Sequence, residues 1–498
     1  MFAGILRLPK VTGGVSPRYN KTLSATLPIE TLPLPKHLVL PLRQHAGADA
    51  IPVVKPGDCV YKGQLIALPP TEISAPVHAS SSGTVAEISE VAAPHPSGLT
   101  ARAIIIECDG LDRWQPREPL SNPYHTPPLE LAERVASAGI VGMGGAIFPA
   151  AVKLKQGTRH EIKTIIVNGS ECEPYLTCDD RLMRERARDI VEGAKLIHHI
   201  LRAYQVVIAI EDNKPEALSA MRAASERHGM IEVQAVPTRY PMGSAKQLIQ
   251  QVTGREVPAG ARSTSVGVLV HNVGTVYAIQ QALVYGRPLI SRVVTVAGGC
   301  VAEPKNVEAR IGTPVQDLLE YCGGLTESPS KLVMGGPMMG EPLVSTEVPL
   351  IKGATGVLAL SKDEVPREEA SPCIRCGRCV DACPMGLLPL DMAAHSRVDD
   401  FDGADDAGLK DCILCGSCAF VCPSHIPLVH YFQYAKGEQD TKRQAERKLA
   451  YTTALAEARE QRLAEEAAAK AAAKAAKKAK KKRKPVKAES NSEGESAS

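Results

Sequence analysis

The chain has 498 residues, too many for one hydrophobic core, and its length predicts roughly three or more domains. Apolar residues make up 44% of it, but no apolar run approaches the roughly 20 residues that span a bilayer, which excludes a helical membrane protein. The net charge of +3 combines an acidic body with a basic C-terminal segment, and the N-terminus lacks a secretory signal pattern. We therefore expect a cytoplasmic chain, in which clustered cysteines serve as metal ligands or catalysts more often than as disulfides.

Short alternating segments open the chain. Between Val53 and Ser89, apolar and polar residues alternate around Gly57, Gly63 and Gly83, which predicts short strands joined by glycine turns. The pattern is typical of the flattened β-barrel of biotinyl and lipoyl carriers. The hairpin LPPTEIS at 68–74 has no lysine to modify, however, so we predict a structural barrel-sandwich hybrid domain within residues 1–120.

From Leu129 to Tyr285 the pattern changes to alternating helices and strands. Residues 129–139 have helical spacing, 162–168 predict a buried strand, and 180–201 predict one long amphipathic helix. A strand at 205–212, a helix at 215–229 and a strand at 231–240 follow. This alternation indicates a mostly parallel sheet with crossover helices, and we predict a Rossmann-like α/β domain over 121–287.

The region from Val293 to Gly324 predicts strand, turn, strand and helix. We expect a small β-grasp unit over 288–330, followed by a connector at 331–365. The unit shows no reactive constellation of side chains, so a structural bridge is the favoured interpretation.

Two cysteine runs carry the strongest chemical signal: CIRCGRCVDACP at 373–384 and CILCGSCAFVCP at 412–423. Three closely spaced thiols and a Cys-Pro are typical of 4Fe–4S sites, and in two-cluster ferredoxins the fourth cysteine ligates the other cluster. Zinc would favour paired knuckles over triplets. We predict a helical two-cluster ferredoxin-type domain over 366–437. The first cluster would be held by Cys373, Cys376, Cys379 and Cys422, and the second by Cys383, Cys412, Cys415 and Cys418.

The other six cysteines are dispersed and lack ligand spacing, so buried free thiols are expected for most of them.

The final segment, 438–498, is rich in alanine and lysine. Residues 441–498 carry 16 Lys or Arg against 8 Asp or Glu, whereas the rest of the chain carries 42 against 47. We predict a basic tail, helical or disordered. A solvated tail and one that touches anionic lipid, acidic partners or nucleic acid all fit this composition.

A glycine-rich turn offers a nucleotide site. Gly142, Gly144 and Gly145 allow the backbone N–H groups to approach a phosphate, and a helix starting near Pro149 adds its positive end. The strand at 162–168 then ends in the acidic stretch NGSECEP, at the carboxyl edge where open sheets bind ligands.

These two stretches, together with YPMGSAKQL at 240–248 and HNVGT at 271–275, resemble the flavin- and NADH-binding subunit of respiratory complex I. With the barrel before them and the twin ferredoxin runs after them, the chain resembles the RnfC family of the Rnf electron-transport complexes, from FAGILRLP at 2–9 through about Gly437. The β-grasp unit resembles the soluble-ligand-binding segment of the same relatives.

The resemblance implies site residues. It implies FMN contacts at Gly142, Gly144, Gly145, Lys153, Asn168, Glu171, Gly243, Asn272 and Thr275. It implies NADH contacts at Phe148 and Glu173, with the phenylalanine stacking on the nicotinamide nucleotide. Met143, Ile147, Ser170, Ser244 and Ala245 depart from the complex I pattern, so the dinucleotide contacts are less defined than the flavin site.

The resemblance also implies a function, since a flavin can join the two-electron chemistry of NADH to one-electron iron–sulfur clusters. It implies an oxidoreductase subunit between NADH and ferredoxin, with non-covalent FMN and two 4Fe–4S clusters, peripheral on the cytoplasmic side of a bacterial inner membrane. The implied partners are the other Rnf subunits, both membrane-embedded ones and a ferredoxin-like iron–sulfur subunit, with ferredoxin reached indirectly and no nucleic acid. A soluble corrinoid reductase and a flavin-free docking scaffold stay open as alternatives.

Overall fold

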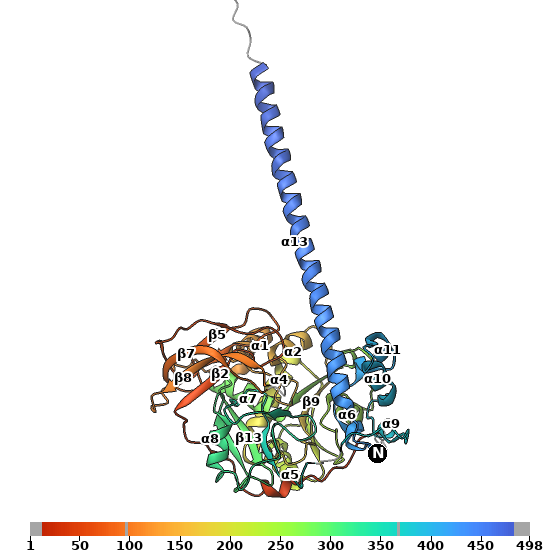
Figure 1. The fold of residues 1–498 in the computed structure, drawn as a ribbon. Coiled ribbons are helices and arrows are strands. Elements are labelled where there is room, and N and C mark those ends of the chain that lie inside the picture. The colour runs from red at the N-terminus through yellow and green to blue at the C-terminus, as the bar shows by residue number, and fades with distance from the viewer. Residues whose placement is uncertain (1–11, 95–97, 366–368, 483–498) are drawn as a thin grey trace, which may run out of the picture. The chain divides into compact units, whose positions relative to one another are not determined.

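A computed structural model describes residues 12–94, 98–365 and 369–482 (Figure 1). The stretch FAGILRLP and the end of the predicted tail lie outside this range. The chain divides into two compact units, one extending to Phe432 and the other beginning at Gln433. Among the described residues, no helix is both long enough and apolar enough to cross a membrane.

Two small antiparallel sheets form the N-terminal barrel. The first contains β2 (His37–Pro41), β8 (Thr100–Cys108), β7 (Gly83–Ala92) and β4 (Cys59–Val60), in that order. The second contains β3 (Ile51–Pro52), β5 (Leu65–Leu68) and β6 (Val77–His78). Leu40, Ile66 and Ile104 are fully buried in the core of this module. The predicted glycine turns occur, and Gly63 has a φ of +80°, which favours glycine.

The α/β region is built on a four-stranded parallel sheet. Its strands are β9 (Thr164–Gly169), β10 (Gln205–Glu211), β11 (Ile231–Val236) and β12 (Val268–Asn272), in the spatial order β11-β10-β9-β12. The chain moves outward from β9 to β11 and then returns to the other side of β9. The order therefore reverses between β9 and β12, which is the position where open parallel sheets bind ligands.

Besides the short helix α3 (Cys178–Glu185), six α-helices and two short 3-10 turns of the described residues accompany this sheet. The helices are α1 (Pro128–Ser137), α2 (Ala150–Gly157), α4 (Ala187–Leu201), α5 (Pro215–Ser225), α6 (Ala245–Thr253) and α7 (Val273–Tyr285). The turns are η2 (Pro123–His125) and η3 (Ser263–Val266). The helix predicted to begin near Pro149 is α2, and the predicted strands at 162–168, 205–212 and 231–240 are confirmed as β9, β10 and β11.

The single helix predicted at 180–201 is wrong, because the structure has two helices. A short helix, α3 (Cys178–Glu185), precedes α4, and the backbone leaves the helical region at Arg186, with φ −124° and ψ 27°. Both helices contact α5 and α7, but α3 also contacts β13, whereas α4 also contacts α1 and α2. Different packing partners therefore bend the chain at a point without the glycine or proline that would have signalled a break.

A six-stranded mixed sheet follows, in the order β1-β14-β13-β17-β15-β16. The predicted strand–strand–helix unit is confirmed as β13 (Ser291–Ala297), β14 (Lys305–Arg310) and α8 (Val315–Tyr321). Residues 331–365, predicted as a connector, contribute β15 (Lys331–Met334), β16 (Glu341–Leu343) and β17 (Gly356–Leu360). The edge strand β1 (Glu30–Thr31) comes from the N-terminal segment, just after η1 (Lys21–Leu23), so this sheet is built from distant parts of the chain.

The cysteine-rich region is helical, as predicted. It contains α9 (Arg378–Asp381), α10 (Pro389–Ser396), α11 (Phe401–Asp406), η4 (Leu409–Asp411) and α12 (Ser417–Phe420). Both runs have the same backbone: Arg375 and Leu414 have φ of 55° and 56°, and Gly377 and Gly416 have φ of 75° and 79°. Two non-glycine residues in the left-handed region at matching positions indicate that both loops are shaped for one purpose.

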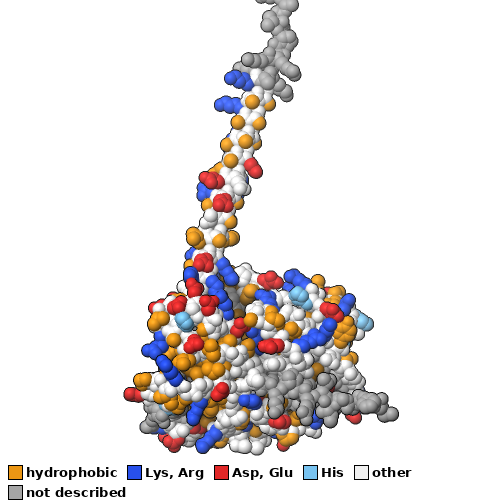
Figure 2. Space-filling model, turned by 90° about the vertical axis from the view of Figure 1, so that its right-hand side faces the viewer, with side chains coloured by type: hydrophobic (Ala, Val, Ile, Leu, Met, Phe, Trp, Pro, Cys, Tyr) orange, Lys and Arg blue, Asp and Glu red, His pale blue; other side chains and the backbone are white. Residues whose placement is uncertain are grey.

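The long helix α13 (Leu428–Lys482) starts in the folded unit and makes up the described part of the second unit. Its large apolar side chains beyond Phe432 are exposed, among them Leu449, Tyr451, Leu455 and Leu463. Figure 2 shows hydrophobic and charged side chains interspersed along this helix. The predicted tail is thus helical through Lys482, without the continuous apolar stripe of a packed helix.

Candidate functional site

The switch point between β9 and β12 brings together several predicted flavin residues. Asn168, next to the last residue of β9, and Asn272, the last residue of β12, lie opposite each other in register. The Asn168 amide donates a hydrogen bond of 2.8 Å to the Gly243 carbonyl and accepts one of 3.0 Å from the Ser170 amide. Three segments that are distant in sequence therefore meet at the carboxyl edge of the sheet.

The glycine-rich turn lies beside the same edge. An antiparallel bridge between Val141 and Pro149 closes it, and the Gly142 amide donates to the Phe148 carbonyl over 2.8 Å. A Cβ added at Gly144 would lie 3.4 Å from the side chain of Asn272. Gly144 and Gly145 are exposed, and a Cβ at Gly145 would meet no atom within 4 Å. The backbone at these glycines is therefore open to a ligand.

Helix α7 begins under this turn. Asn272 caps it by accepting a hydrogen bond of 2.9 Å from the Gly274 amide. The Thr275 hydroxyl, in the first turn of α7, accepts a hydrogen bond of 2.9 Å from the Met143 amide. The positive end of a 13-residue helix thus faces the glycine turn, which suits a phosphate group.

Lys153 supplies a cation to this region. It lies on α2, and burial lowers the pKa of its amine. The amine is close enough to His271 of β12 to contribute, after burial, to lowering the pKa of that imidazole to about 3. Within residues 12–94, 98–365 and 369–478, no side chain or carbonyl accepts a hydrogen bond from Lys153. A half-buried ammonium without a partner fits an anionic group such as the FMN phosphate.

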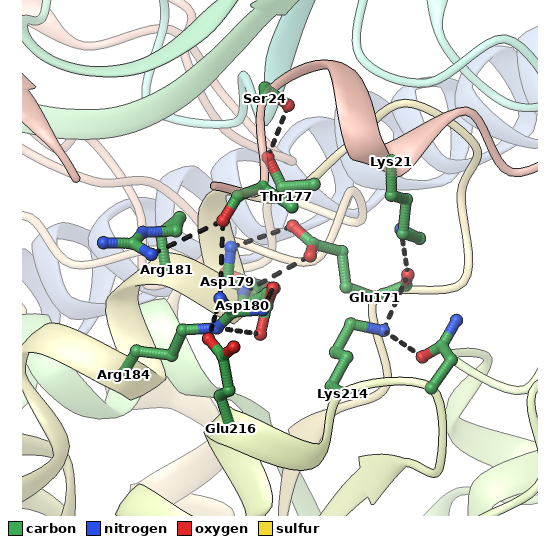
Figure 3. A network of polar contacts seen from close by, with 12 residues as sticks. Lys21, Ser24, Glu171, Thr177, Asp179, Asp180, Arg181, Arg184, Lys214 and Glu216 are labelled. Atoms are coloured by element: carbon green, nitrogen blue, oxygen red, sulfur yellow. Dashed lines mark hydrogen bonds and ion pairs between the residues drawn. The ribbon is translucent and has the colours of Figure 1, made fainter. Parts of the chain in front are cut away.

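Glu171 is buried and has a structural role as well as its predicted one. Its carboxylate accepts hydrogen bonds from the amides of Asp179, over 2.8 Å, and Asp180, over 3.3 Å, and so caps the N-terminus of α3 (Figure 3). Burial, and then the charge of Glu171, raise the pKa of Asp179 to about 7. The Asn272 amide donates to Asp179 over 2.6 Å. Asp179, which sequence reasoning missed, therefore joins Glu171 to the flavin edge.

Glu173 lies two residues farther along. One carboxylate oxygen accepts a hydrogen bond of 3.1 Å from the Met338 amide, in the loop between β15 and β16. The other oxygen, Oε1, is buried and has no hydrogen-bond partner among the described residues. Burial raises the pKa of Glu173 to about 7. An unpaired buried acceptor of this kind fits a donor on a ligand, such as the ribose hydroxyls or the amide of NADH.

Lys21 holds the backbone of this acidic loop, defined here as residues 170–177. Its amine donates to the carbonyls of Glu171, Glu173 and Leu176 over 2.7, 2.9 and 2.6 Å. Figure 3 shows Lys21 and Lys214 approaching the loop from different elements. Lys214 donates to the Glu171 carbonyl over 3.4 Å and pairs with Glu211 over 2.6 Å. Sequence reasoning missed Lys21, because it belongs to no motif and lies 150 residues before Glu171.

Seven of the eight cysteine thiols in the two runs have neighbours that agree with the predicted groups. Beyond burial, the neighbours that raise the pKa of Cys379 are Cys376 and Cys422, and those that raise the pKa of Cys418 are Cys415, Cys412 and Cys383. The last four line one cavity with apolar side chains that include Met392 and Phe432. Clustered thiols in an apolar cavity suit an iron–sulfur cluster. The Cys373 thiol accepts a hydrogen bond from the Arg375 amide.

The cluster region contacts the flavin edge directly. The Tyr240 hydroxyl donates to the Cys415 carbonyl over 2.6 Å, and the Gln247 amide donates to the Pro384 carbonyl over 2.8 Å. Lys246 pairs with Asp411 over 3.0 Å. The segment 240–248, which also carries Gly243, therefore spans from the end of β9 to the second thiol group.

An open flavin-type edge joined to two cysteine-rich loops defines an iron–sulfur flavoprotein that transfers electrons. Comparisons with family models agree for each module. The RnfC barrel sandwich hybrid domain matches residues 9–111, the Nuo51 FMN-binding domain 135–281, the SLBB domain 293–342 and a 4Fe–4S dicluster domain 372–426.

Curated relatives extend this match over most of the chain. An ion-translocating oxidoreductase complex subunit of the RnfC type from Rhodobacter capsulatus is 49% identical over 429 residues, covering 86% of this chain and 83% of its own. The subunits of the same name from Serratia proteamaculans and Haemophilus influenzae are 45% and 44% identical; each alignment covers 91% of this chain, and 65% and 68% of theirs. The chain belongs to the RnfC family of ion-translocating oxidoreductase complex subunits.

Its cofactors are FMN and 4Fe–4S clusters, as expected, and it is an electron-transfer oxidoreductase subunit. The match to an FMN-binding domain argues against the flavin-free scaffold, and the shared name of the relatives favours the ion-translocating complex over a corrinoid reductase. Among solved structures, an NAD⁺-reducing [NiFe]-hydrogenase in the H2-reduced state aligns with a TM-score of 0.44 and 16% identity, over 64% of this chain and 62% of that one.

Proposed function

We propose that this chain exchanges electrons between NADH and the remaining subunits of an ion-translocating complex, and through them with ferredoxin. It would lie on the cytoplasmic side of the inner membrane as a peripheral subunit, beside membrane-embedded subunits and a ferredoxin-like iron–sulfur subunit. The observation that carries the proposal is the contact of segment 240–248 with both the end of β9 and the loop of Cys415. Redox groups at these two places would be neighbours.

The flavin would be held mainly by backbone and by one cation. The amides at Gly144 and Gly145, the N-terminus of α7 and the Lys153 amine would bind the phosphate, and the Gly142 amide, which donates to the Phe148 carbonyl, would hold the turn in shape. Asn168, Gly243 and the Asn272–Thr275 turn would line the ring side. When bound, FMN converts between the two-electron chemistry of nicotinamide and the one-electron chemistry of clusters.

The acidic loop would position the nicotinamide and hold protons. Glu173 Oε1 would accept a hydrogen bond from NADH, and Phe148, half-buried on the glycine turn, would stack on it. Asp179 accepts from Asn272 at Oδ2 and, with a pKa near neutrality, would hold a proton at Oδ1 beside the ring edge.

The first cluster would be ligated by Cys373, Cys376, Cys379 and Cys422, and the second by Cys383, Cys412, Cys415 and Cys418. The neighbouring thiols of Cys379 and Cys418 support this crossed arrangement. Because the Cys415 loop contacts Tyr240, the second cluster would be the nearer to the flavin site, and the first would be the outer one.

A bulky side chain at Gly144 tests the flavin assignment. The variant Gly144→Leu should lose FMN, because its Cβ would lie 3.4 Å from Asn272 and the rest of the side chain would fill the phosphate side. NADH oxidation with ferricyanide should disappear with it, while iron content and the cluster signals in electron paramagnetic resonance stay normal. Gly229→Leu, at an exposed turn where a Cβ meets nothing within 4 Å, is the matched control. Full FMN content in Gly144→Leu would refute the assignment.

A further inference from the structure

The two cysteine loops have the same backbone but different surroundings. In the second run, Cys415 and Cys418 are buried, with 7% and 8% exposure, and the loop lies against Tyr240. In the first run, Cys373 and Cys376 are both exposed. One site of the pair therefore faces the flavin domain, and the other faces outward.

The two loops also differ in sequence in a way that matches their difference in exposure. The buried loop reads CILCGSC and the exposed loop reads CIRCGRC, so Arg375 and Arg378 replace Leu414 and Ser417 at equivalent positions. Both arginines are exposed. Within an otherwise repeated motif, the outward loop thus has two additional positive charges next to the thiols of a redox site, and Asp381, also exposed, stands where the second run has Phe420.

Each of the two runs also exposes a large apolar side chain. Ile374, between Cys373 and Cys376, is 68% exposed, and Phe420, two residues before Cys422, is 54% exposed. Figure 2 views the folded unit from the side of α9, α10 and α11 and shows hydrophobic side chains beside both basic and acidic ones. A solvated loop needs neither residue, whereas an exposed apolar centre with arginines around it is the composition of an interface.

We infer that this exit surface, defined as Cys373, Ile374, Arg375, Arg378 and Phe420, is the docking surface for an acidic one-electron carrier protein of the iron–sulfur type. The inference rests on the proposed function and names the place where electrons cross to the partner. Arg375 and Arg378 would attract acidic groups of the carrier, and Ile374 and Phe420 would contact an apolar patch beside its redox centre.

The transfer balances with one electron and no proton. A reduced carrier gives one electron to the oxidised first cluster, the carrier becomes oxidised, and two such events supply the electron pair that, with one proton, reduces NAD⁺ to NADH. The reverse direction uses the same surface. A 4Fe–4S cluster exchanges electrons singly, which suits a one-electron carrier as the partner.

The test uses the full chain with both cofactors and two probe carriers of opposite charge. The first probe is reduced plant-type [2Fe–2S] ferredoxin, an acidic protein, with formation of NADH from NAD⁺ as the readout. The second is ferricytochrome c, a basic protein, reduced by NADH. The variant is R375E/R378E, and the matched control is R222E/R227E, which makes the same charge change at two exposed arginines elsewhere.

At low salt, R375E/R378E should slow the ferredoxin reaction by about tenfold or more and speed the cytochrome c reaction, with both effects shrinking as salt is raised. The control variant should change neither rate by more than about twofold. Phe420→Ser should slow both probes regardless of salt, because it removes apolar contact and not charge.

Two results would overturn the inference: equal rates for R375E/R378E and the wild type with both probes, or the same loss in the control variant. Failure of the proposed function looks different, since the wild-type chain itself would then form no NADH from reduced ferredoxin. NADH oxidation by ferricyanide and the potential of the first cluster are measured in every variant. If a shift in the reduction potential of the first cluster alone accounts for the changed rates, the rates will change by the same factor at all salt concentrations. That result would also contradict the docking surface.

Discussion

Replacing Lys21 with methionine removes the ammonium group that contacts the acidic loop and keeps most of the aliphatic part of the side chain. The amine makes three short hydrogen bonds to loop carbonyls, at 2.7, 2.9 and 2.6 Å. Hydrogen bonds to a charged group contribute about 1.5–3 kcal/mol each, and the cost of burying the ammonium, several kcal/mol, offsets most of their sum. That burial also lowers the pKa of Lys21. We expect a net loss of about 2 kcal/mol in the free energy that holds the loop in its binding conformation. If this loss appears fully in the binding of NADH, the affinity falls roughly 25-fold.

The assay is NADH oxidation with ferricyanide, from which KM and kcat are determined separately. Lys21→Met should raise KM for NADH and leave kcat within about threefold, because the loop orients the nucleotide and does not react with it. FMN and iron contents should stay normal. Lys21→Arg should recover part of the affinity, and Lys36→Met, at an exposed lysine of the same segment, should behave as the wild type. An unchanged KM in a variant with full cofactor content would refute the reasoning.

Three further predictions follow from the site. Cys383→Ala should lose the cluster of Cys412, Cys415 and Cys418, seen by iron analysis and paramagnetic resonance, and loss of the other cluster instead would show that the ligands do not cross. Glu173→Gln should raise the melting temperature more at pH 8 than at pH 5. Burial raises the pKa of Glu173 to about 7, so the wild type loses stability as the pH rises from the ordinary pKa of a glutamate through 7, whereas the glutamine stays neutral. An equal gain in melting temperature at pH 8 and pH 5 would show that folding does not raise the pKa of Glu173. Deletion after Gly437 should leave cofactors and NADH oxidation unchanged and weaken membrane binding only at low salt, since the basic residues between Lys470 and Lys487 contribute on the order of 1 kcal/mol each near anionic lipid. Loss of NADH oxidation in the truncated chain would place the tail in the catalytic unit.

Local patterns in the sequence predict local structure well. The repeated cysteine runs, the strands β9 to β11 and the start of α2 at the glycine turn were all visible in residue spacing. The cofactors were predicted from the family resemblance. Each of these features depends on residues close together in the chain, where periodicity and turn chemistry act.

The features that sequence did not predict depend on contacts between distant residues. Lys21 reaches the acidic loop across 150 positions, and no local signal marks it. Strands β15 to β17 have only three to five residues each, too few for a clear alternation, and they gain their partners from a sheet that begins at β1. The break at Arg186 reflects the neighbours that α3 and α4 do not share, β13 for α3 and α1 for α4.

The loop between β15 and β16 shows how such an unpredicted contact affects the site. Sequence assigned it to a connector, yet its Met338 amide holds Glu173, and a Cβ on Gly416 would lie 3.1 Å from the Met338 carbonyl. The loop therefore contacts both the acidic loop and the second cysteine run. Tertiary packing alone places it there.

The NADH site and both clusters are proposed to lie on one electron path within this chain. The most direct test reduces the purified chain fully without oxygen, removes the reductant and adds NAD⁺. Because FMN holds two electrons and each cluster one, we expect about two NADH formed per chain, with both clusters becoming oxidised at the same time. Formation of about one NADH per chain while the clusters stay reduced would contradict a single path.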